Sequence, residues 1–178
     1  FTVVVSLAIA LAHSVNASPA QAAFRIAVAS NFLNTANKLV DAYSNDRKST
    51  AEIISGSTGK LYAQINFGAP YDVFLAGDSV RPMLLSKASQ DFANISHVYA
   101  VGQLVLWAPN VSNDEQKCSQ HLLEMPFKYI ALANPETAPY GEAALATLRK
   151  LKKIEILRSK LVYGENVSQV LSYILTGS

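Results

Sequence analysis

Short apolar runs alternate with segments of helical periodicity from residue 24 to the end of the chain. In the first half, the runs 24–29, 51–55 and 71–76 predict strands, and an amphipathic segment that predicts a helix follows each of them. The apolar residues of the first such segment are Phe32, Ala36, Leu39, Val40 and Tyr43. This β-α-β-α-β-α order predicts an open, mostly parallel sheet with helices on both faces.

The second half of the chain repeats this alternation. Residues 128–133 predict a strand, and a helix follows from about residue 140 to residue 151. Residues 161–163 then predict a short strand, and a further helix follows from residue 167. The repeated order predicts a second α/β lobe.

The apolar run Val98–Ala108 is long for one strand and predicts a strand that crosses between the lobes. We therefore predict a first lobe over 24–101 and a second over 102–178. Residues 1–23 contain no Asp, Glu, Lys or Arg and end in small residues, which is typical of a secretory signal peptide. We expect the sequence to begin inside this signal and to end before the chain returns to the first lobe.

Candidate ligand contacts stand where strands pass into helices. Ser30 follows the first strand, Ser57 and Thr58 follow the second, and Tyr140 and Val167 lie where the two second-lobe helices begin. Strand ends of a parallel sheet meet at one edge, where ligands bind. The first N–H groups of a helix are unpaired and lie at the positive end of its dipole, which favours an anion. Simple helix capping is the alternative explanation at each position.

The segment Gly56–Leu61 also invites comparison with a nucleotide phosphate loop. That motif requires glycine where Ile54 stands, and Ser or Thr where Leu61 stands. The segment therefore does not match a nucleotide-binding loop.

Composition narrows the functional classes. The chain has 178 residues, of which 50% are hydrophobic and 16% charged, with a net charge of +2. A weakly charged chain without a Lys/Arg stripe gives no case for nucleic-acid binding. The three histidines and one cysteine lack metal-ligand spacing, and no G-x-S-x-G nucleophile motif is present, so neither a metal site nor a hydrolase is predicted.

A cleft lined only by hydrogen-bond donors selects among anions by protonation. A protonated oxyanion would direct its own O–H at another donor, so the site would reject it. Molybdate, tungstate and sulfate are fully deprotonated at neutral pH, whereas phosphate is not. The choice among those three anions depends on cavity size and stays open at this point.

Four segments carry a resemblance to a known family: Val28–Asn31, Gly56–Leu61, Gly68–Phe74 and Asn134–Gly141. Together they resemble the periplasmic molybdate-binding proteins of molybdate ABC transporters. The resemblance implies a two-lobed type II, or Venus-flytrap, binding fold that is monomeric, periplasmic and not an enzyme. It also implies capture of molybdate or tungstate, without a cofactor or a separate metal, for delivery to a membrane permease. A sulfate-type or other small-anion binding protein of the same fold is the alternative.

The resemblance also implies a set of ligand contacts. These are Ser30, Asn31, Thr58, Tyr140 and Val167, with Ser57 as the alternative to Thr58. Thr58 departs from many members, which have serine there, and its extra methyl group would line the cavity. Many members use a further tyrosine hydroxyl beyond the fourth helix, and this sequence ends before that position.

Overall fold

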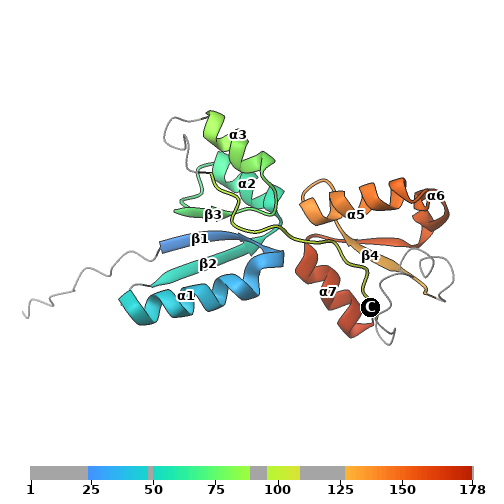
Figure 1. Cartoon of the computed structure of the whole chain (residues 1–178), viewed down its shortest axis with the longest axis horizontal. Helices are drawn as coiled ribbons and strands as arrows, with labels where there is room; N and C mark the ends of the chain where they lie inside the picture. Colours follow the sequence, from blue (N-terminus) through green and yellow to red (C-terminus); the bar gives the residue numbers. More distant parts are fainter. Residues whose placement is uncertain (1–23, 48–49, 89–95, 109–126, 178) are drawn as a thin grey trace, which may run out of the picture.

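The computed structural model describes residues 24–47, 50–88, 96–108 and 127–177. Two α/β units lie side by side, joined by a long connection that runs between them (Figure 1). We call residues 24–88 the first lobe and residues 127–177 the second lobe. The predicted signal segment, 1–23, lies outside the described residues.

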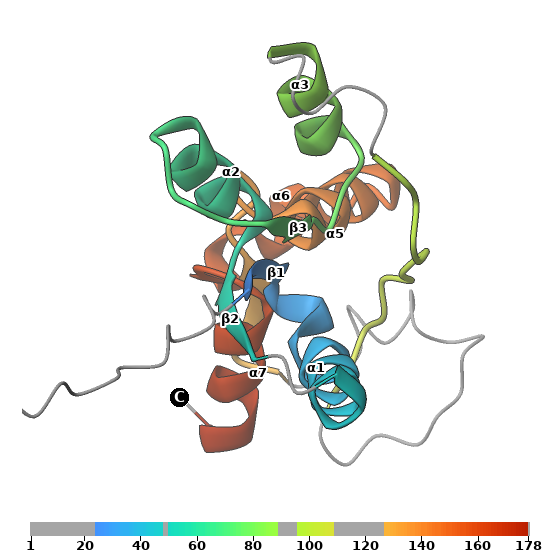
Figure 2. The ribbon, with the colours of Figure 1, turned by 90° about the vertical axis from the view of Figure 1, so that its left-hand side faces the viewer.

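The first lobe contains a parallel sheet with strand order β2-β1-β3. Its strands are β1 (Phe24–Ala29), β2 (Ala51–Gly56) and β3 (Val73–Leu75). Its helices are α1 (Leu33–Arg47), preceded by the 3-10 turn η1 (Ser30–Phe32), α2 (Thr58–Asn66) and α3 (Val80–Ala88). Ala27 and Val28 of the central strand are fully buried, because α1 covers one face of the sheet while α2 and α3 lie on the other (Figures 1 and 2).

The second lobe is built around one parallel pair of strands. Its elements are β4 (Ile130–Ala133), α5 (Pro139–Lys150), α6 (Ile154–Leu157), the 3-10 turn η4 (Arg158–Lys160), β5 (Leu161–Gly164) and α7 (Val167–Thr176). Leu132, Leu148 and Leu157 form its buried core. Helices α5 and α7 lie on opposite sides of β4 (Figure 1). The predicted α/β fold with parallel strands is therefore confirmed, whereas the division at residues 101 and 102 stays a prediction.

The prediction of a crossing strand at Val98–Ala108 is wrong. Residues 96–108 form an extended connection without strand pairing. A strand requires a hydrogen-bonded neighbour, and no strand among the described residues pairs with this segment. Its apolar side chains stay largely exposed as a result, Val101 at 88%. The apolar sequence led us to predict a paired strand, but this segment has no pairing partner among the described residues.

None of the helices in the described ranges is long and apolar enough to cross a membrane.

Asp72 ties the beginnings of β1 and β3 together. Its carboxylate Oδ2 accepts a hydrogen bond of 2.7 Å from the backbone N–H of Arg25, and its own N–H donates to the Arg25 carbonyl at 2.9 Å. We expect Asp72→Ala to lower the free energy of unfolding by about 1–2 kcal/mol, because the charged acceptor of this bond is lost. Urea denaturation measures the change. Asp41→Ala, which removes an exposed carboxylate of α1, is the control, and equal midpoints for the two variants would contradict the prediction.

Candidate anion-binding site

The two lobes meet around a small cavity formed by their strand-to-helix junctions. Its lining residues are Ala29, Ser30, Asn31, Gly56, Ser57, Thr58, Ala138, Pro139, Tyr140 and Val167. The structure therefore brings together all five predicted contacts and the alternative, Ser57. Residues separated by more than a hundred positions in the sequence share one cavity because both lobes direct the carboxyl ends of their strands toward it.

The remaining lining residues were not predicted from the sequence. Ala29, Gly56, Ala138 and Pro139 immediately precede or flank the predicted contacts at the same junctions. None of their side chains can donate a hydrogen bond, so a search for polar candidates passes over them. The signal that could have found Ala29, Gly56 and Ala138 is their small size beside a polar junction, since small residues let a bound group approach the backbone. Pro139 could have been found as the proline that begins α5.

The helix beginnings at the cavity leave backbone donors unused. Within the described residues, no hydrogen bond uses the backbone N–H of Thr58, Tyr140 or Val167. The residues before α2 and α5 make no side-chain cap, whereas the side chain of Asn166 caps α7 by accepting from the N–H of Gln169 at 3.1 Å. Simple capping thus explains Asn166 but not Ser57. The unused N–H groups can donate to an anion in the cavity.

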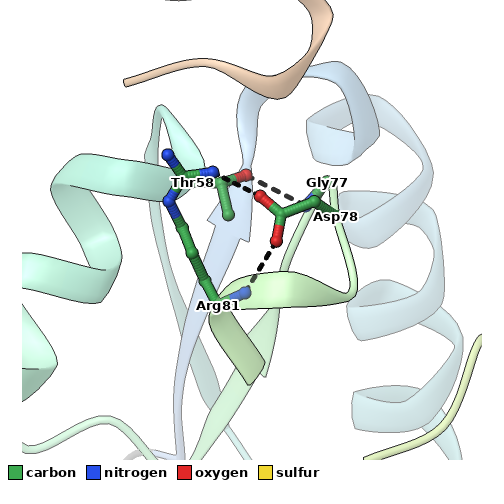
Figure 3. Close-up of polar contacts among 4 residues, drawn as sticks. All are labelled: Thr58, Gly77, Asp78 and Arg81. Carbon is green, nitrogen blue, oxygen red and sulfur yellow. Dashed lines mark hydrogen bonds and ion pairs between the residues drawn. The ribbon is translucent and has the colours of Figure 1, made fainter. Parts of the chain in front are cut away.

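The Thr58 hydroxyl is held in place by the turn before α3. Its Oγ1 accepts a hydrogen bond of 2.9 Å from the backbone N–H of Gly77, and the residue is only 1% exposed (Figure 3). Because an acceptor site of this oxygen is occupied, its O–H is left to donate elsewhere. A Cβ at Gly77 would lie 3.1 Å from Thr58 Oγ1 and 3.4 Å from Asn31 Oδ1, so glycine permits this close approach.

Asp78 and Arg81 brace the same turn. Asp78 Oδ1 accepts from the backbone N–H of Arg81 at 2.8 Å, and the carboxylate also forms an ion pair with the Arg81 guanidinium (Figure 3). Neither residue lines the cavity. Asp78 therefore acts at the start of α3, whereas the Asp72 carboxylate binds the backbone N–H of Arg25.

The Ser57 hydroxyl has no hydrogen-bond partner among the described residues, although its oxygen is buried and the residue is 3% exposed. A buried polar atom without a partner is uncommon and costly. From its position in the cavity lining, this hydroxyl can donate to a polar ligand. The structure thus retains Ser57 as an alternative ligand contact beside Thr58.

Tyr99 links the connection 96–108 to the first-lobe side of the site. Its hydroxyl donates to the Ala76 carbonyl at 2.8 Å. Its ring packs edge-on against the Phe32 ring, with the two ring centroids 5.0 Å apart. Burial, and secondarily the neighbouring Tyr140, raises the pKa of the Tyr99 phenol above its ordinary value. The phenol therefore remains a neutral donor at physiological pH and holds the chain directly before Gly77.

The ten lining residues carry no formal charge. Hydroxyls, an amide and backbone N–H groups are instead available as donors, and they can stabilise an anion without a Lys or Arg in the cavity. In the part of the chain that the structure describes, no cluster of three His, Cys, Asp or Glu side chains could hold a metal ion. The chemistry available at this cavity is therefore recognition of a small anion by fixed dipoles.

Comparison with protein families supports a binding function. The model of the family described as bacterial extracellular solute-binding protein matches residues 24–178. The chain belongs to this family.

Two curated relatives of this solute-binding protein are named for one ligand. The molybdate-binding protein ModA of Azotobacter vinelandii is 38% identical over 175 residues, which cover 97% of this chain and 68% of the relative. The molybdate-binding protein ModA of Rhodobacter capsulatus is 34% identical over 152 residues, which cover 85% of this chain and 60% of the relative. Both are binding proteins, which agrees with the prediction that the chain is not an enzyme.

A solved structure supports the fold assignment of the solute-binding protein. The periplasmic molybdate-binding protein of Azotobacter vinelandii superimposes with a TM-score of 0.77 and 33% sequence identity. The match covers 86% of this chain and 67% of that structure. The chain therefore shares its two-lobed α/β architecture with a solved binding protein.

Proposed function

We propose that this solute-binding protein captures molybdate in the cavity between its lobes and delivers it to the permease of an ABC transporter. The observation that carries the proposal is the uncharged lining, in which hydroxyls, an amide and backbone N–H groups at helix beginnings of both lobes are available as donors. Two relatives named for molybdate support the choice of anion. On this proposal, the protein works in the periplasm as a monomer, residues 1–23 are its export signal, and it has no cofactor and no nucleic-acid partner.

The proposed contacts divide into side-chain and backbone donors. Ser30, Asn31 and Thr58 offer side-chain groups from the first lobe, with Ser57 as the alternative to Thr58. Tyr140 and Val167 offer backbone N–H groups from the second lobe. A tetrahedral oxyanion bound in this way would accept bonds from both lobes at once and would hold them together. Tungstate has the same charge and geometry as molybdate and is proposed as a second ligand.

The proposal predicts an order of affinities. We expect molybdate and tungstate to bind tightly, and phosphate to bind at least about 100-fold more weakly, because a protonated oxygen would leave a buried donor facing another donor. Isothermal titration calorimetry of the protein at pH 7 with molybdate, tungstate, sulfate and phosphate measures this order. Sulfate binding as tight as molybdate binding would move the function to a sulfate-type receptor. The absence of heat with all four anions would overturn the oxyanion proposal.

A further inference from the structure

Among the described residues, three polar contacts cross directly between the lobes. The Gly59 N–H donates to the Thr137 carbonyl at 2.8 Å, and the Ser168 hydroxyl approaches the Ser30 carbonyl at 3.5 Å. The third contact is an ion pair, in which Lys60 Nζ of α2 lies 2.7 Å from Glu165 Oε1 of the second lobe. This ion pair joins the two lobes through side chains that both carry full charge.

The ion pair stands next to two proposed ligand contacts. Lys60 follows Thr58 by two positions, and Glu165 precedes Val167 by two. Glu165 is itself held, because its backbone N–H donates to Gln169 Oε1 at 2.6 Å. The pair therefore adjoins two cavity-lining residues in the sequence, although neither Lys60 nor Glu165 lines the cavity itself.

The position of Lys60 is unfavourable for its own helix. It lies in the first turn of α2, at the positive end of the helix dipole, where a cation costs a few tenths of a kcal/mol and an acidic residue would be favoured. Glu165 lies close to the proposed site of a dianion, which it would repel. Pairing offsets the cost of Lys60 at the start of α2, and it would also offset the repulsion between Glu165 and a bound dianion.

Separation of the lobes would break this pair. Ser57 and Thr58 are 3% and 1% exposed, and the cavity that they line is formed by residues of both lobes, so we expect separation of the lobes to open access to their hydroxyls. The Lys60–Glu165 pair spans the two lobes and cannot survive that separation. In the separated form, Lys60 becomes an unpaired cation beside Thr58, the proposed ligand contact of α2.

We propose that Lys60 changes partner during capture, attracting the oxyanion when the lobes are apart and pairing with Glu165 when they close. The proposal rests on the oxyanion-binding function proposed above and adds two positioning residues to it. In the open form, the lysine raises the association rate. In the closed form, the ion pair slows release and cancels the repulsion between Glu165 and the bound anion.

Kinetic measurements on charge variants separate the two effects. Isothermal titration gives Kd, and a chase of labelled molybdate with excess unlabelled molybdate gives koff; their ratio gives kon. Because the side chains are 49% and 63% exposed, we expect Glu165→Gln to raise koff by only about two- to five-fold. Lys60→Met should raise koff similarly and also lower kon. High salt should reduce these differences, because the charges are solvent-accessible.

The exchanged pair, Lys60→Glu with Glu165→Lys, is the decisive variant. It can restore the ion pair of the closed form and hence the slow koff. It also places a carboxylate beside Thr58, which would repel the incoming oxyanion, so kon should fall. The matched control is Glu155→Gln, which removes the exposed pair between Glu155 and Arg158, 2.9 Å apart within the second lobe, and should change neither rate. Wild-type koff in both single variants, or no recovery of koff in the exchanged variant, would overturn the proposal.

A ligand-free measurement distinguishes failure of this proposal from failure of the proposed function. Small-angle X-ray scattering reports the separation of the lobes without any anion. We expect Glu165→Gln to shift the protein toward a more extended form and the exchanged pair to reverse the shift. An unchanged profile would contradict the ion-pair proposal even if molybdate binds. Absence of molybdate binding by the wild-type protein would instead overturn the proposed function.

Discussion

Thr58→Val is expected to weaken molybdate binding by about 10- to 100-fold. Valine keeps the shape of threonine but removes a proposed donor to a charged ligand, and such bonds are worth about 1.5–3 kcal/mol. The same change removes the acceptor of the Gly77 N–H bond, 2.9 Å long, which holds the turn before α3. A lower melting temperature should therefore accompany the loss of affinity. Calorimetric titration measures the first effect and thermal denaturation the second.

Two further variants locate the hydroxyl that contacts the anion. Thr58→Ser retains the hydroxyl and should bind within a few-fold of the wild type. Ser57→Ala removes the buried hydroxyl that has no partner among the described residues. If Ser57→Ala loses affinity while Thr58→Val binds normally, the contact belongs to Ser57 and the assignment to Thr58 is wrong. Loss of affinity in both would mean that the two hydroxyls act together.

Gly141→Ala is expected to destabilise the second lobe and to abolish tight molybdate binding. In an ordinary helix position, this substitution would stabilise by about 1 kcal/mol. Here the added Cβ would lie 2.0 Å from the Ala133 carbonyl oxygen and 2.7 Å from its carbon. These are backbone atoms of β4, which cannot move aside as a flexible side chain could. We expect a loss of about 3 kcal/mol, the upper end of the usual cost of overpacking.

The effect on binding follows from the position of Gly141 in α5. It directly follows Tyr140, whose backbone N–H is a proposed contact, so any displacement of the helix start displaces that donor. Gly56→Ala is the control for stability only, because its added Cβ would lie 3.5 Å from the Leu61 side chain, an ordinary contact, although Gly56 itself lines the cavity. Urea denaturation of both variants and calorimetric titration of Gly141→Ala test the prediction. A Gly141→Ala protein as stable as the Gly56→Ala protein would contradict it.

The alternation of short apolar runs and amphipathic segments was enough to predict most elements. The strands at 24–29 and 51–55 correspond to β1 and β2, and each is followed by the expected helix. Such elements are predictable because burial on a sheet face or along a helix stripe imposes a local period on the residues. The junction residues Ser30 and Thr58 were found for the same reason, since a strand end and a helix beginning are both local features.

Contacts between residues distant in the sequence had to come from the tertiary structure. The segment Val98–Ala108 has the composition of a strand but lacks a pairing partner among the described residues, and pairing is a property of two segments rather than one. The bond from Gly77 to Thr58 and the ion pair between Lys60 and Glu165 likewise join separate elements.

The sequence by itself therefore determined the α/β class, the strand-to-helix junctions and the polar residues placed on them. The tertiary structure decided which junctions face each other across one cavity, which hydroxyl is held by a backbone donor, and which charges meet between the lobes. The physical reason is that periodicity records the burial of each element, whereas the orientation of donors toward a shared cavity arises only when both lobes pack together.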